Sequence, residues 1–462
     1  MRSRFIVIIA VLSPRRAQTR AASHPACPAP TTITSYWLAT GSPFYRNSLN
    51  LHFSVKILVI GSGGREHAIA WRLSFEGHEI YGAPGNPGIE QVARLLPATG
   101  YLAAAESIHP DLTMVGPEVP LVAGIVDQFR ARGFAIVGPT QEMAQLEASK
   151  IYSKDFMQRL GIPTARFVRT GSEEMALRAL AQFTCPVVVK ADGLAAGKGV
   201  IIAHDRAEAE SAVRALGPRL VIEEFLLGEE VSFIALCDGR NIVPLDATQD
   251  HKAVGDGDTG PNTGGMGAYS DGRILSTEDS QQVMDTVIEP AVRATRFTGF
   301  LYAGLMMTAD GPKVLEFNVR LGDPETQPLM HRFDGDLAEI LMRAATGALA
   351  GATLRSKPEP SVCVVLAAAG YPGQVRTGDL IRGVNDCGAQ VFHAGTKMGR
   401  GGLETAGGRV LGVTASGPDL ASAVRNTYSA VERIRFDGMH YRRDIAQKGL
   451  KRWPSAAIES RS

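Results

Sequence analysis

Cysteine, aromatic residues and net charge are all scarce in this chain. Aromatic residues make up 6% of its 462 residues, and the formal net charge is +1. A charge this small gives no indication of nucleic-acid binding. Independently of the charge, we expect small-molecule partners and a monomer. The five cysteines lack the paired spacing of a metal site and favour reduced thiols in the cytoplasm; they are Cys27, Cys185, Cys237, Cys363 and Cys387.

Long hydrophobic runs are missing as well, so no membrane span is expected. The apolar run at residues 5–12 is too short to cross a bilayer. Residues 1–54 contain six Arg but no Lys, Asp or Glu, which leaves a net charge of −5 on the rest of the chain. This composition is typical of a targeting peptide. Ordinary protein sequence begins abruptly at Val55, however, which favours a start codon assigned too far upstream, and a functional extension is the third alternative.

The remaining chain has the composition of an ordinary globular protein with several domains. Hydrophobic residues make up 45% of the sequence and charged residues 21%. From Val55, short buried strands alternate with helices, which predicts an α/β domain with a doubly wound parallel sheet at residues 55–154. Ligands should bind where its strands end. The expected strands are 56–60, 79–81, 112–115 and 135–137, and the expected helices are 67–75 and 122–132.

An α+β pattern follows, and we expect it to form a larger domain at residues 155–356. A flap subdomain is expected at about 167–226, and residues 243–269 are expected to be mostly a functional loop. The expected strands are 187–190, 200–203, 220–223, 231–236, 301–308 and 313–318. The Pro-containing segment 357–360 marks a boundary, after which a small α+β domain should extend to residue 450 and a tail to 462. That domain has expected strands at 362–368, 390–393 and 410–415, and an expected helix at 420–434.

The segment 313–327 (KVLEFNVRLGDPETQ) carries the densest group of polar residues. Glu316 and Asn318 are two residues apart on an apolar strand, so they point to one face. A carboxylate beside an amide oxygen suits Mg²⁺ held jointly with phosphates. Arg320, Asp323 and Glu325 follow in a Gly/Pro loop, which predicts a reaction centre at this strand end.

Two glycine-rich segments predict phosphate contacts. The turn 61–67 (GSGGREH) joins a strand to a helix and can bind an anion. Glu66 stands where a dinucleotide fingerprint requires Gly, so the turn favours one phosphate over NAD, with a purely structural turn as the alternative. The segment 190–199 lacks the spacing of a Walker loop. It instead predicts a flap whose Lys190 and Lys198 cover ATP phosphates, unless it is only a solvated hairpin.

Other polar groups are less specific. The acids of 221–230 follow a strand, where acids are most often solvated. The segment 249–267 lacks the order of an EF-hand and suits a substrate-binding loop. We interpret His67, His251 and His331 as structural residues.

Together these motifs resemble the ATP-grasp ligases, and specifically the glycinamide ribonucleotide synthetase (phosphoribosylamine–glycine ligase) family, from Val55 to about Leu450. The segments that carry the resemblance occur in the order typical of that family. They are 61–68 (GSGGREHA), 84–88 (PGNPG), 115–118 (VGPE), 190–199 (KADGLAAGKG), 223–225 (EEF), 249–252 (QDHK), 258–269 (DTGPNTGGMGAY), 316–327 (EFNVRLGDPETQ) and 395–396 (GT).

The resemblance implies an ATP-dependent ligase of purine synthesis. It would join glycine to 5-phosphoribosylamine through a glycyl phosphate, with Mg²⁺ or Mn²⁺ as metal. The resemblance assigns Lys150, Lys190, Lys198, Glu223, Glu224, Phe225, Leu226 and Glu230 to ATP, and Glu316 and Asn318 to the metal. It assigns Gly63, Gly64, Arg65, Asn86, Pro87, Glu118, Asp258 and Asn262 to the substrates. It places Asp250, Lys252, Arg320 and Asp323 near glycine and the acyl phosphate as catalytic residues.

Two features qualify this resemblance. Leu321 stands where the family usually has Phe, and residues 303–306 offer no second metal-binding Glu, which the family also lacks. The alternatives are another ATP-grasp carboxylate–amine ligase, an NAD-dependent dehydrogenase or a nucleotide-binding regulatory module.

Overall fold

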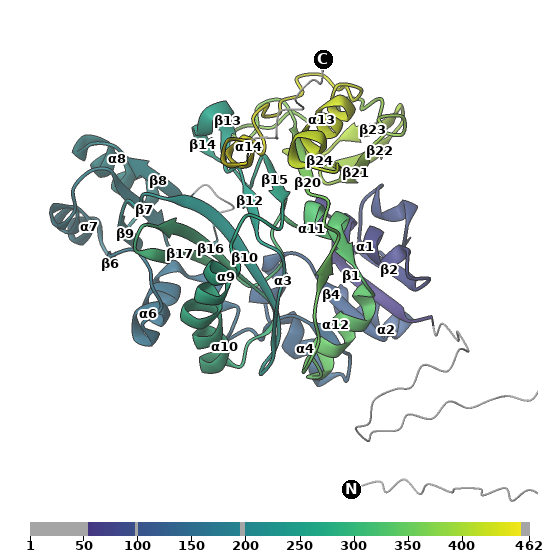
Figure 1. Cartoon of the computed structure of the whole chain (residues 1–462), viewed down its shortest axis with the longest axis horizontal. Helices are drawn as coiled ribbons and strands as arrows, with labels where there is room; N and C mark the ends of the chain where they lie inside the picture. The colour runs from purple at the N-terminus through teal and green to yellow at the C-terminus, as the bar shows by residue number, and fades with distance from the viewer. Residues whose placement is uncertain (1–53, 98–99, 195–198, 454–462) are drawn as a thin grey trace, which may run out of the picture. The chain divides into compact units, whose positions relative to one another are not determined.

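The computed structural model describes residues 54–97, 100–194 and 199–453 (Figure 1). The N-terminal extension expected before Val55 and Lys198 of the flap therefore lie outside the described residues. Among the described residues, no helix has the length and apolar character that a membrane crossing needs.

The first part of the described chain forms a five-stranded parallel sheet with the order β3-β2-β1-β4-β5. Its strands are β1 (Lys56–Gly61), β2 (Glu79–Pro84), β3 (Arg94–Leu95), β4 (Leu112–Val115) and β5 (Ile136–Val137). Its helices are α1 (Gly64–Ser74), α2 (Tyr101–Ile108), α3 (Glu118–Val122) and α4 (Ile125–Ala131), with the 3₁₀ turn η1 (Ile89–Gln91). The predicted parallel sheet is confirmed.

The helix predicted at 122–132 is interrupted, which corrects the sequence interpretation. Gly124 has φ +81°, a left-handed conformation that a continuous α-helix does not contain. Helix α3 therefore ends at Val122 and α4 starts at Ile125. The two-residue strand β3 was not predicted, because a segment that short has no readable period.

The flap is a four-stranded antiparallel sheet with the order β6-β9-β7-β8 and its own apolar core. It follows helices α5 (Gln145–Ala148) and α6 (Lys150–Leu160). Its elements are β6 (Phe167–Thr170), α7 (Glu173–Ala179), η2 (Leu180–Gln182), β7 (Val187–Ala191), β8 (Val200–Ala203), α8 (Arg206–Leu216) and β9 (Leu220–Glu224). Helix α8 begins because the Asp205 carboxylate accepts the Glu208 N–H, and its buried Ala209 and Val213 face the sheet.

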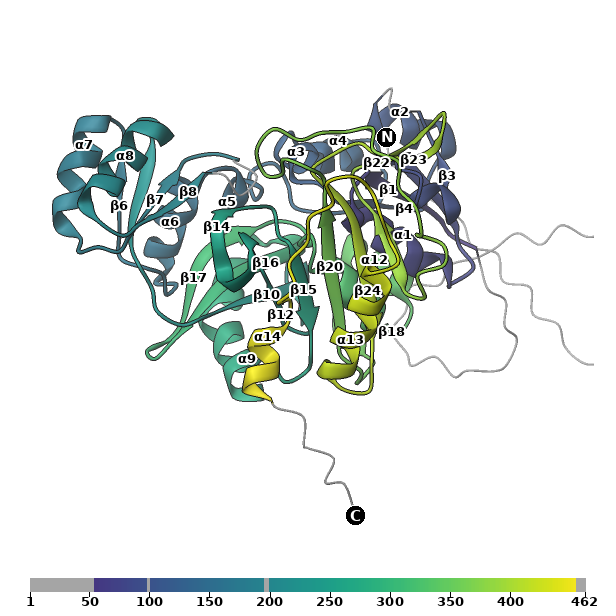
Figure 2. The same ribbon diagram turned by 90° about the horizontal axis from the view of Figure 1, so that it is seen from above.

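A second sheet of nine strands has the order β17-β16-β10-β12-β15-β20-β24-β21, with β11 paired to β10. Its first strands are β10 (Glu229–Asp238), β11 (Ile242–Pro244), β12 (Thr248–Asp250), β15 (Gly267–Ser270), β16 (Thr298–Thr308) and β17 (Gly311–Asn318). Strands β20 (Ser361–Ala367), β21 (Gln390–His393) and β24 (Arg409–Ser416) come from beyond the predicted boundary at 357–360. The sheet is continuous across it, because β15 pairs with β20 (Figure 2).

The prediction that residues 243–269 are mostly loop is wrong. Besides β11, β12 and β15, they contain the hairpin β13 (Ala253–Gly255) and β14 (Thr259–Asn262), with η3 (Asp256–Asp258) between. The Gly-rich polar sequence hides these strands. The strand β15 also has a distant pairing partner, as in the pair Tyr269 and Val362, whereas β13 and β14 pair with each other.

Helices and short hairpins cover the nine-stranded sheet and complete the fold. Helix α13 (Leu420–Val431) contacts β20 and β24, close to the predicted helix at 420–434. The other elements are α9 (Thr277–Val283), η4 (Met284–Ile288), α10 (Glu289–Thr295), α11 (Thr326–Arg332), β18 (Phe333–Asp334), α12 (Leu337–Thr346), β19 (Arg355–Ser356), β22 (Thr396–Gly399), β23 (Gly402–Thr405) and α14 (Gln447–Arg452). The predicted sequence of an α/β domain, α+β domains and a small α+β domain is confirmed.

Candidate active site

A cavity of about 570 Å³ is lined by residues of the parallel-sheet domain, of the flap and of the nine-stranded sheet, including the start of β24. Most of the residues that the sequence singled out line it. They are Gly63, Arg65, Glu118, Lys150, Lys190, Glu223, Glu224, Phe225, Leu226, Glu230, Asp250, Lys252, Asn262, Glu316, Asn318, Arg320 and Asp323.

Four described residues of the predicted substrate group do not line the cavity: Gly64, Asn86, Pro87 and Asp258. Asn86 is buried, and its amide donates to the carbonyls of Ser62 and His393 at 2.8 Å each. Its Oδ1 accepts the N–H of Ile89 at 2.9 Å. The Asn86 side chain thus shapes the turn after β2.

Asp258 points toward the C-terminal segment of the chain. Each of its two carboxylate oxygens forms an ion pair at 2.8 Å, one with Arg442 and the other with Lys448. Burial raises the pKa of Asp258, but the hydrogen bonds from Lys448 and Arg442 hold it below its ordinary value. Arg442, which is 1% exposed, also donates to the Ala253 carbonyl, so this cluster anchors the β13–β14 hairpin.

A lysine cluster forms one end of the cavity. The carboxylate of Glu223 is 1% exposed and lies between Lys154 Nζ at 3.0 Å and Lys190 Nζ at 2.9 Å. Lys190 also donates to the Leu315 carbonyl at 3.0 Å, and Lys150 donates to the Gly193 carbonyl at 2.9 Å. Two ammonium groups therefore meet at the carboxylate that was expected to meet adenosine, and the third, Lys150, lines the same cavity.

Lys154 was missed in the sequence, although a signal for it exists. It lies four residues after Lys150 on α6, so the two lysines share one helix face. Burial lowers the pKa of Lys154 to about 8, although the nearby Glu223 raises it. A buried residue in a cavity whose pKa is shifted by burial and by a charged neighbour is a candidate for a functional role.

The predicted metal pair faces the cavity from β17. The Glu316 carboxylate lies 3.8 Å from Lys252 Nζ, and Asn318 Oδ1 accepts from Arg320 at 3.3 Å. Burial raises the pKa of Glu316, but Lys252, Lys190 and Lys150 hold it below its ordinary value. An ionised carboxylate and an amide oxygen beside one another fit a divalent cation.

On the neighbouring strand, Glu316 faces a glycine. Glu316 pairs with Gly304 on β16, and a Cβ built on Gly304 would lie 3.4 Å from Glu316 Cγ. That distance is an ordinary van der Waals contact, so Gly304 packs beside the Glu316 side chain without adding a polar group to the site.

A group of buried acids lies beside this pair. Burial raises the pKa of Asp250 to about 7; Lys252 lowers it, and Glu325 raises it further. Tyr302 Oη donates to Glu325 Oε1 at 2.8 Å, and Lys252 Nζ lies 3.2 Å from Glu230. Tyr302 and Glu325 also line the cavity and were not among the predicted site residues.

The opposite end of the cavity is built around arginines from distant segments. Arg320 donates to Glu147 at 2.8 Å and lies 3.6 Å from Glu118. Arg65 of α1 donates to the Leu321 carbonyl at 3.0 Å. Burial lowers the pKa of Arg320, but Glu147 and Glu118 raise it above its ordinary value. The loop after β17 is thereby attached to the parallel-sheet domain.

The glycine turn after β1 is filled by a carboxylate of the chain itself. Glu66 Oε2 accepts the Gly63 N–H at 2.6 Å, and Glu66 Oε1 accepts from Arg65 Nε at 2.5 Å. A Cβ built on Gly116 would lie 1.9 Å from Glu66 Oε1, so glycine is required there. Glu66 stands where the dinucleotide fingerprint requires a glycine, and its carboxylate already accepts an N–H of the turn, which argues against the NAD alternative.

Comparison with known proteins identifies the family. Sequence profiles of the N domain, the ATP-grasp (A) domain and the C domain of phosphoribosylglycinamide synthetase match residues 55–147, 148–326 and 361–448. The chain belongs to the phosphoribosylglycinamide synthetase family. The phosphoribosylamine–glycine ligase of Yersinia pestis is 49% identical over 428 residues, which cover 86% of this chain and 100% of that protein. The ligase of Pseudomonas aeruginosa is 48% identical over 424 residues, with 86% and 99% covered.

Solved structures agree with membership of this synthetase family. The crystal structure of phosphoribosylamine–glycine ligase from Thermotoga maritima has a TM-score of 0.75 at 34% identity, covering 85% of this chain and 100% of that one. The biotin carboxylase domain of a Hydrogenobacter thermophilus 2-oxoglutarate carboxylase, solved with MgADP and bicarbonate, has a TM-score of 0.64 at 19% identity. The match covers 83% of this chain and 91% of that domain, and at this identity it supports only a shared fold.

The three histidines that we interpreted as structural do not line the cavity of this synthetase-family chain. His67 Nδ1 accepts the His393 N–H at 2.8 Å, and burial lowers the pKa of His67 to about 3. His331 Nδ1 lies 2.8 Å from Ser416 Oγ. Burial lowers the pKa of His251 to about 4. These imidazoles are neutral near pH 7, as buried packing residues are.

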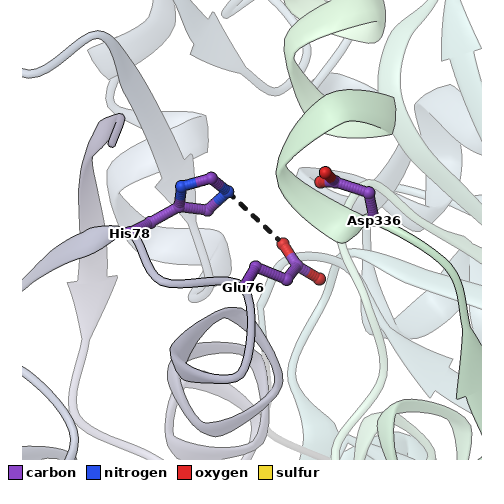
Figure 3. A group of neighbouring side chains, drawn as sticks. All are labelled: Glu76, His78 and Asp336. Carbon is purple, nitrogen blue, oxygen red and sulfur yellow. Dashed lines mark ion pairs between the residues drawn. The ribbon is translucent and has the colours of Figure 1, made fainter. Parts of the chain in front are cut away.

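Away from the cavity, Glu76, His78 and Asp336 have their potential metal-ligand atoms within 4.8 Å of one another (Figure 3). The Glu76 carboxylate already accepts the N–H groups of Leu337 at 2.7 Å and Ala338 at 3.0 Å. Those amides open helix α12, so Glu76 caps this helix from the end of α1. We interpret the group as a structural link in the synthetase-family fold.

Proposed function

We propose that this protein is an ATP-dependent ligase that joins glycine to 5-phosphoribosylamine, giving glycinamide ribonucleotide, ADP and phosphate in purine synthesis. The relatives named phosphoribosylamine–glycine ligase match over nearly their whole length. The observation that carries the proposal is one cavity lined by lysines, by Glu316 and Asn318 of the edge strand β17, and by Arg65 beside a glycine turn.

The reaction needs cations more than it needs a nucleophilic side chain. The carboxylate of glycine is unreactive until ATP converts it to glycyl phosphate. The amine of phosphoribosylamine then forms the C–N bond at the acyl carbon, and the acyl C–O bond to phosphate breaks. Negative charge develops on oxygens in both steps, so Lys252 and Arg320 stabilise it from fixed positions. Exclusion of water protects the acyl phosphate from hydrolysis.

We assign the lysine end to ATP. Lys150 and Lys190 would meet its phosphates together with Lys154, and Lys198 would join them from the flap. The segment Glu224, Phe225 and Leu226 would meet adenosine, with Glu223 and Glu230 nearby. Glu316 and Asn318 would hold a divalent cation, Mg²⁺ or Mn²⁺, which when bound supplies charge neutralisation to phosphoryl transfer.

We assign the arginine end to the ribosylamine and glycine. The predicted residues that line the cavity and that we assign here are Gly63, Arg65, Glu118, Asn262 and Asp323, and Asp250 would meet glycine from its place beside Glu316. Gly64, Asn86 and Pro87 would act by shaping the turns around the phosphate. For Asp258 we propose an anchoring role instead of a substrate contact.

The remaining predictions belong to this proposal. We keep domain boundaries near residues 154 and 356, a monomer and a cytoplasmic location. The cysteines within the described residues, Cys185, Cys237, Cys363 and Cys387, are free, which supports a reducing compartment.

Release of ADP tests the proposal directly. The protein is incubated with ATP, Mg²⁺ and glycine, with and without a mixture that generates 5-phosphoribosylamine. We expect ADP to accumulate only when both substrates are present, together with a product that contains glycine and the ribose phosphate. ADP formation that does not depend on glycine, or that prefers another carboxylic acid, would contradict this assignment and favour another carboxylate–amine ligase.

A further inference from the structure

Arg409 from the C-terminal region lines the same cavity, although no sequence motif pointed to it. Its Nη1 donates to the Gly264 carbonyl at 2.6 Å and also to the carbonyl of Asp323. Its Nη2 lies 3.2 Å from the carboxylate of Asp323. One guanidinium therefore connects the loop after β14 with the loop after β17.

The position of Arg409 is fixed by the sheet. It is the first residue of β24 and pairs with Ala367 of β20. Its own carbonyl accepts the Gly395 N–H at 2.8 Å. Tyr371, from the same C-terminal region, accepts the Gly264 N–H at 3.1 Å through its hydroxyl. Both backbone polar groups of Gly264 are thus held by side chains that follow the predicted domain boundary.

Asp323 lies directly under the glycine turn of the parallel-sheet domain. A Cβ built on Gly63 would lie 3.6 Å from Asp323 Oδ2, and one built on Gly64 would lie 3.8 Å from Asp323 Oδ1. Gln327 donates to Oδ1 at 2.8 Å. Burial raises the pKa of Asp323, but Arg409 and Arg65 hold it below its ordinary value, so the carboxylate stays ionised.

We propose that Arg409 is a positioning residue for acyl transfer: it holds the Asp323 carboxylate and the Gly264 turn together beneath the ribosylamine subsite. This proposal rests on the proposed function. It means that the C-terminal region, which contains Arg409, completes the part of the site that binds the ribosylamine. A planar guanidinium can hold a carboxylate and carbonyls in one fixed geometry, whereas an ammonium cannot. Attack on an acyl phosphate requires alignment that a shift of about 1 Å would disturb.

The test compares Arg409→Lys and Arg409→Ala with Arg376→Ala in the full-length protein. Arg376 is a matched control, because it forms an Arg–Asp pair with Asp379 at 3.0 Å on the exposed surface of the same region. We expect Arg409→Ala to lower kcat/KM for the ribosylamine by about 10- to 100-fold, the range for a lost charged hydrogen bond. The KM for ATP should change less than about 3-fold, since the lysine end is untouched.

Rescue separates positioning from general stability. Free guanidinium ion should restore the activity of Arg409→Ala by about tenfold and leave Arg376→Ala unchanged. Arg409→Lys retains the charge but should still lose about tenfold in kcat/KM for the ribosylamine. If Arg409→Ala does not fold, the Arg409→Lys measurement decides alone.

Three outcomes would overturn the proposal. They are an Arg409→Lys variant with wild-type kinetics, equal losses for ATP and the ribosylamine, and a soluble Arg409→Ala variant that guanidinium does not rescue. An inactive wild-type protein would instead overturn the proposed function, so the two failures are distinguishable.

Discussion

The lysine end and the arginine end of the cavity are both positively charged, but their side chains come from differently arranged parts of the chain. Lys154 and Lys190 both form ion pairs with a single carboxylate, Glu223, and Lys150 precedes Lys154 by one helix turn. Arg65, Arg320 and Arg409 come from three separate regions and donate largely to backbone carbonyls. The lysine end is a local anion-binding cluster, whereas the arginine end also joins the regions of the protein. Substitutions at the lysine end should change the KM for ATP. Substitutions at the arginine end should change kcat/KM for the ribosylamine, which accepts the acyl group.

The largest effect is expected at Glu316, between the two ends. Glu316→Gln should lower turnover by about 100-fold or more, because a neutral amide holds a divalent cation poorly among phosphates. The fold should survive, since the side chain faces the cavity. Turnover is measured over a Mg²⁺ titration. Near-normal turnover at low Mg²⁺ would contradict the proposed metal role.

Arg65→Ala should affect the acceptor end selectively. Loss of a charged hydrogen bond to the substrate phosphate predicts a decrease of about 10- to 100-fold in kcat/KM for the ribosylamine. The KM for ATP should stay within a few-fold. Both constants are measured in the same ADP-release assay. The control is Arg94→Ala, because Arg94 forms an exposed ion pair with Glu79 in the same domain. Equal losses for both substrates would remove the distinction between the two ends.

Lys154→Met should affect the lysine end selectively, with a rise of about 10-fold in the KM for ATP. The direction of its pH dependence follows from its pKa of about 8, which burial lowers from the ordinary value. The cationic form is present below that pKa, so kcat/KM for ATP in the wild type should decline as the pH rises through about 8. The variant should lack this decline. An identical pH profile in both proteins would exclude Lys154 from the ATP site.

The smallest effect is expected at Asp258, which should influence stability more than catalysis. Asp258→Asn weakens its contacts to Arg442 and Lys448, while Arg442 retains Asp444 at 2.7 Å. We expect a loss of about 1 kcal/mol and a decrease of about 2 °C in Tm. The KM values should change less than about 2-fold. Thermal unfolding and steady-state kinetics check this, and a large rise in the KM for the ribosylamine with unchanged Tm would restore Asp258 to the substrate site.

Local signals in the sequence indicated most of the strands and the order of domains, and the family resemblance assigned most of the cavity residues. The alternation of apolar and polar residues that marks β17 also places Glu316 and Asn318 on one face. Glycines at 61, 63 and 64 mark the turn after β1 without reference to any distant residue.

Only the tertiary structure decided the contacts between regions. Arg409 and Asp323 are 86 residues apart, and Arg65 and Leu321 are 256 apart, so no local pattern relates them. Strand β15 within 243–269 was missed for the same reason, since it pairs with β20, whereas the local hairpin β13–β14 was hidden by its Gly-rich polar sequence. Asp258 lies in a segment whose composition is typical of a binding loop. Its side chain, however, forms an ion pair with Arg442, which only the folded chain brings near. Side-chain direction and long-range pairing depend on the packing of the whole chain, whereas strand and turn propensities do not.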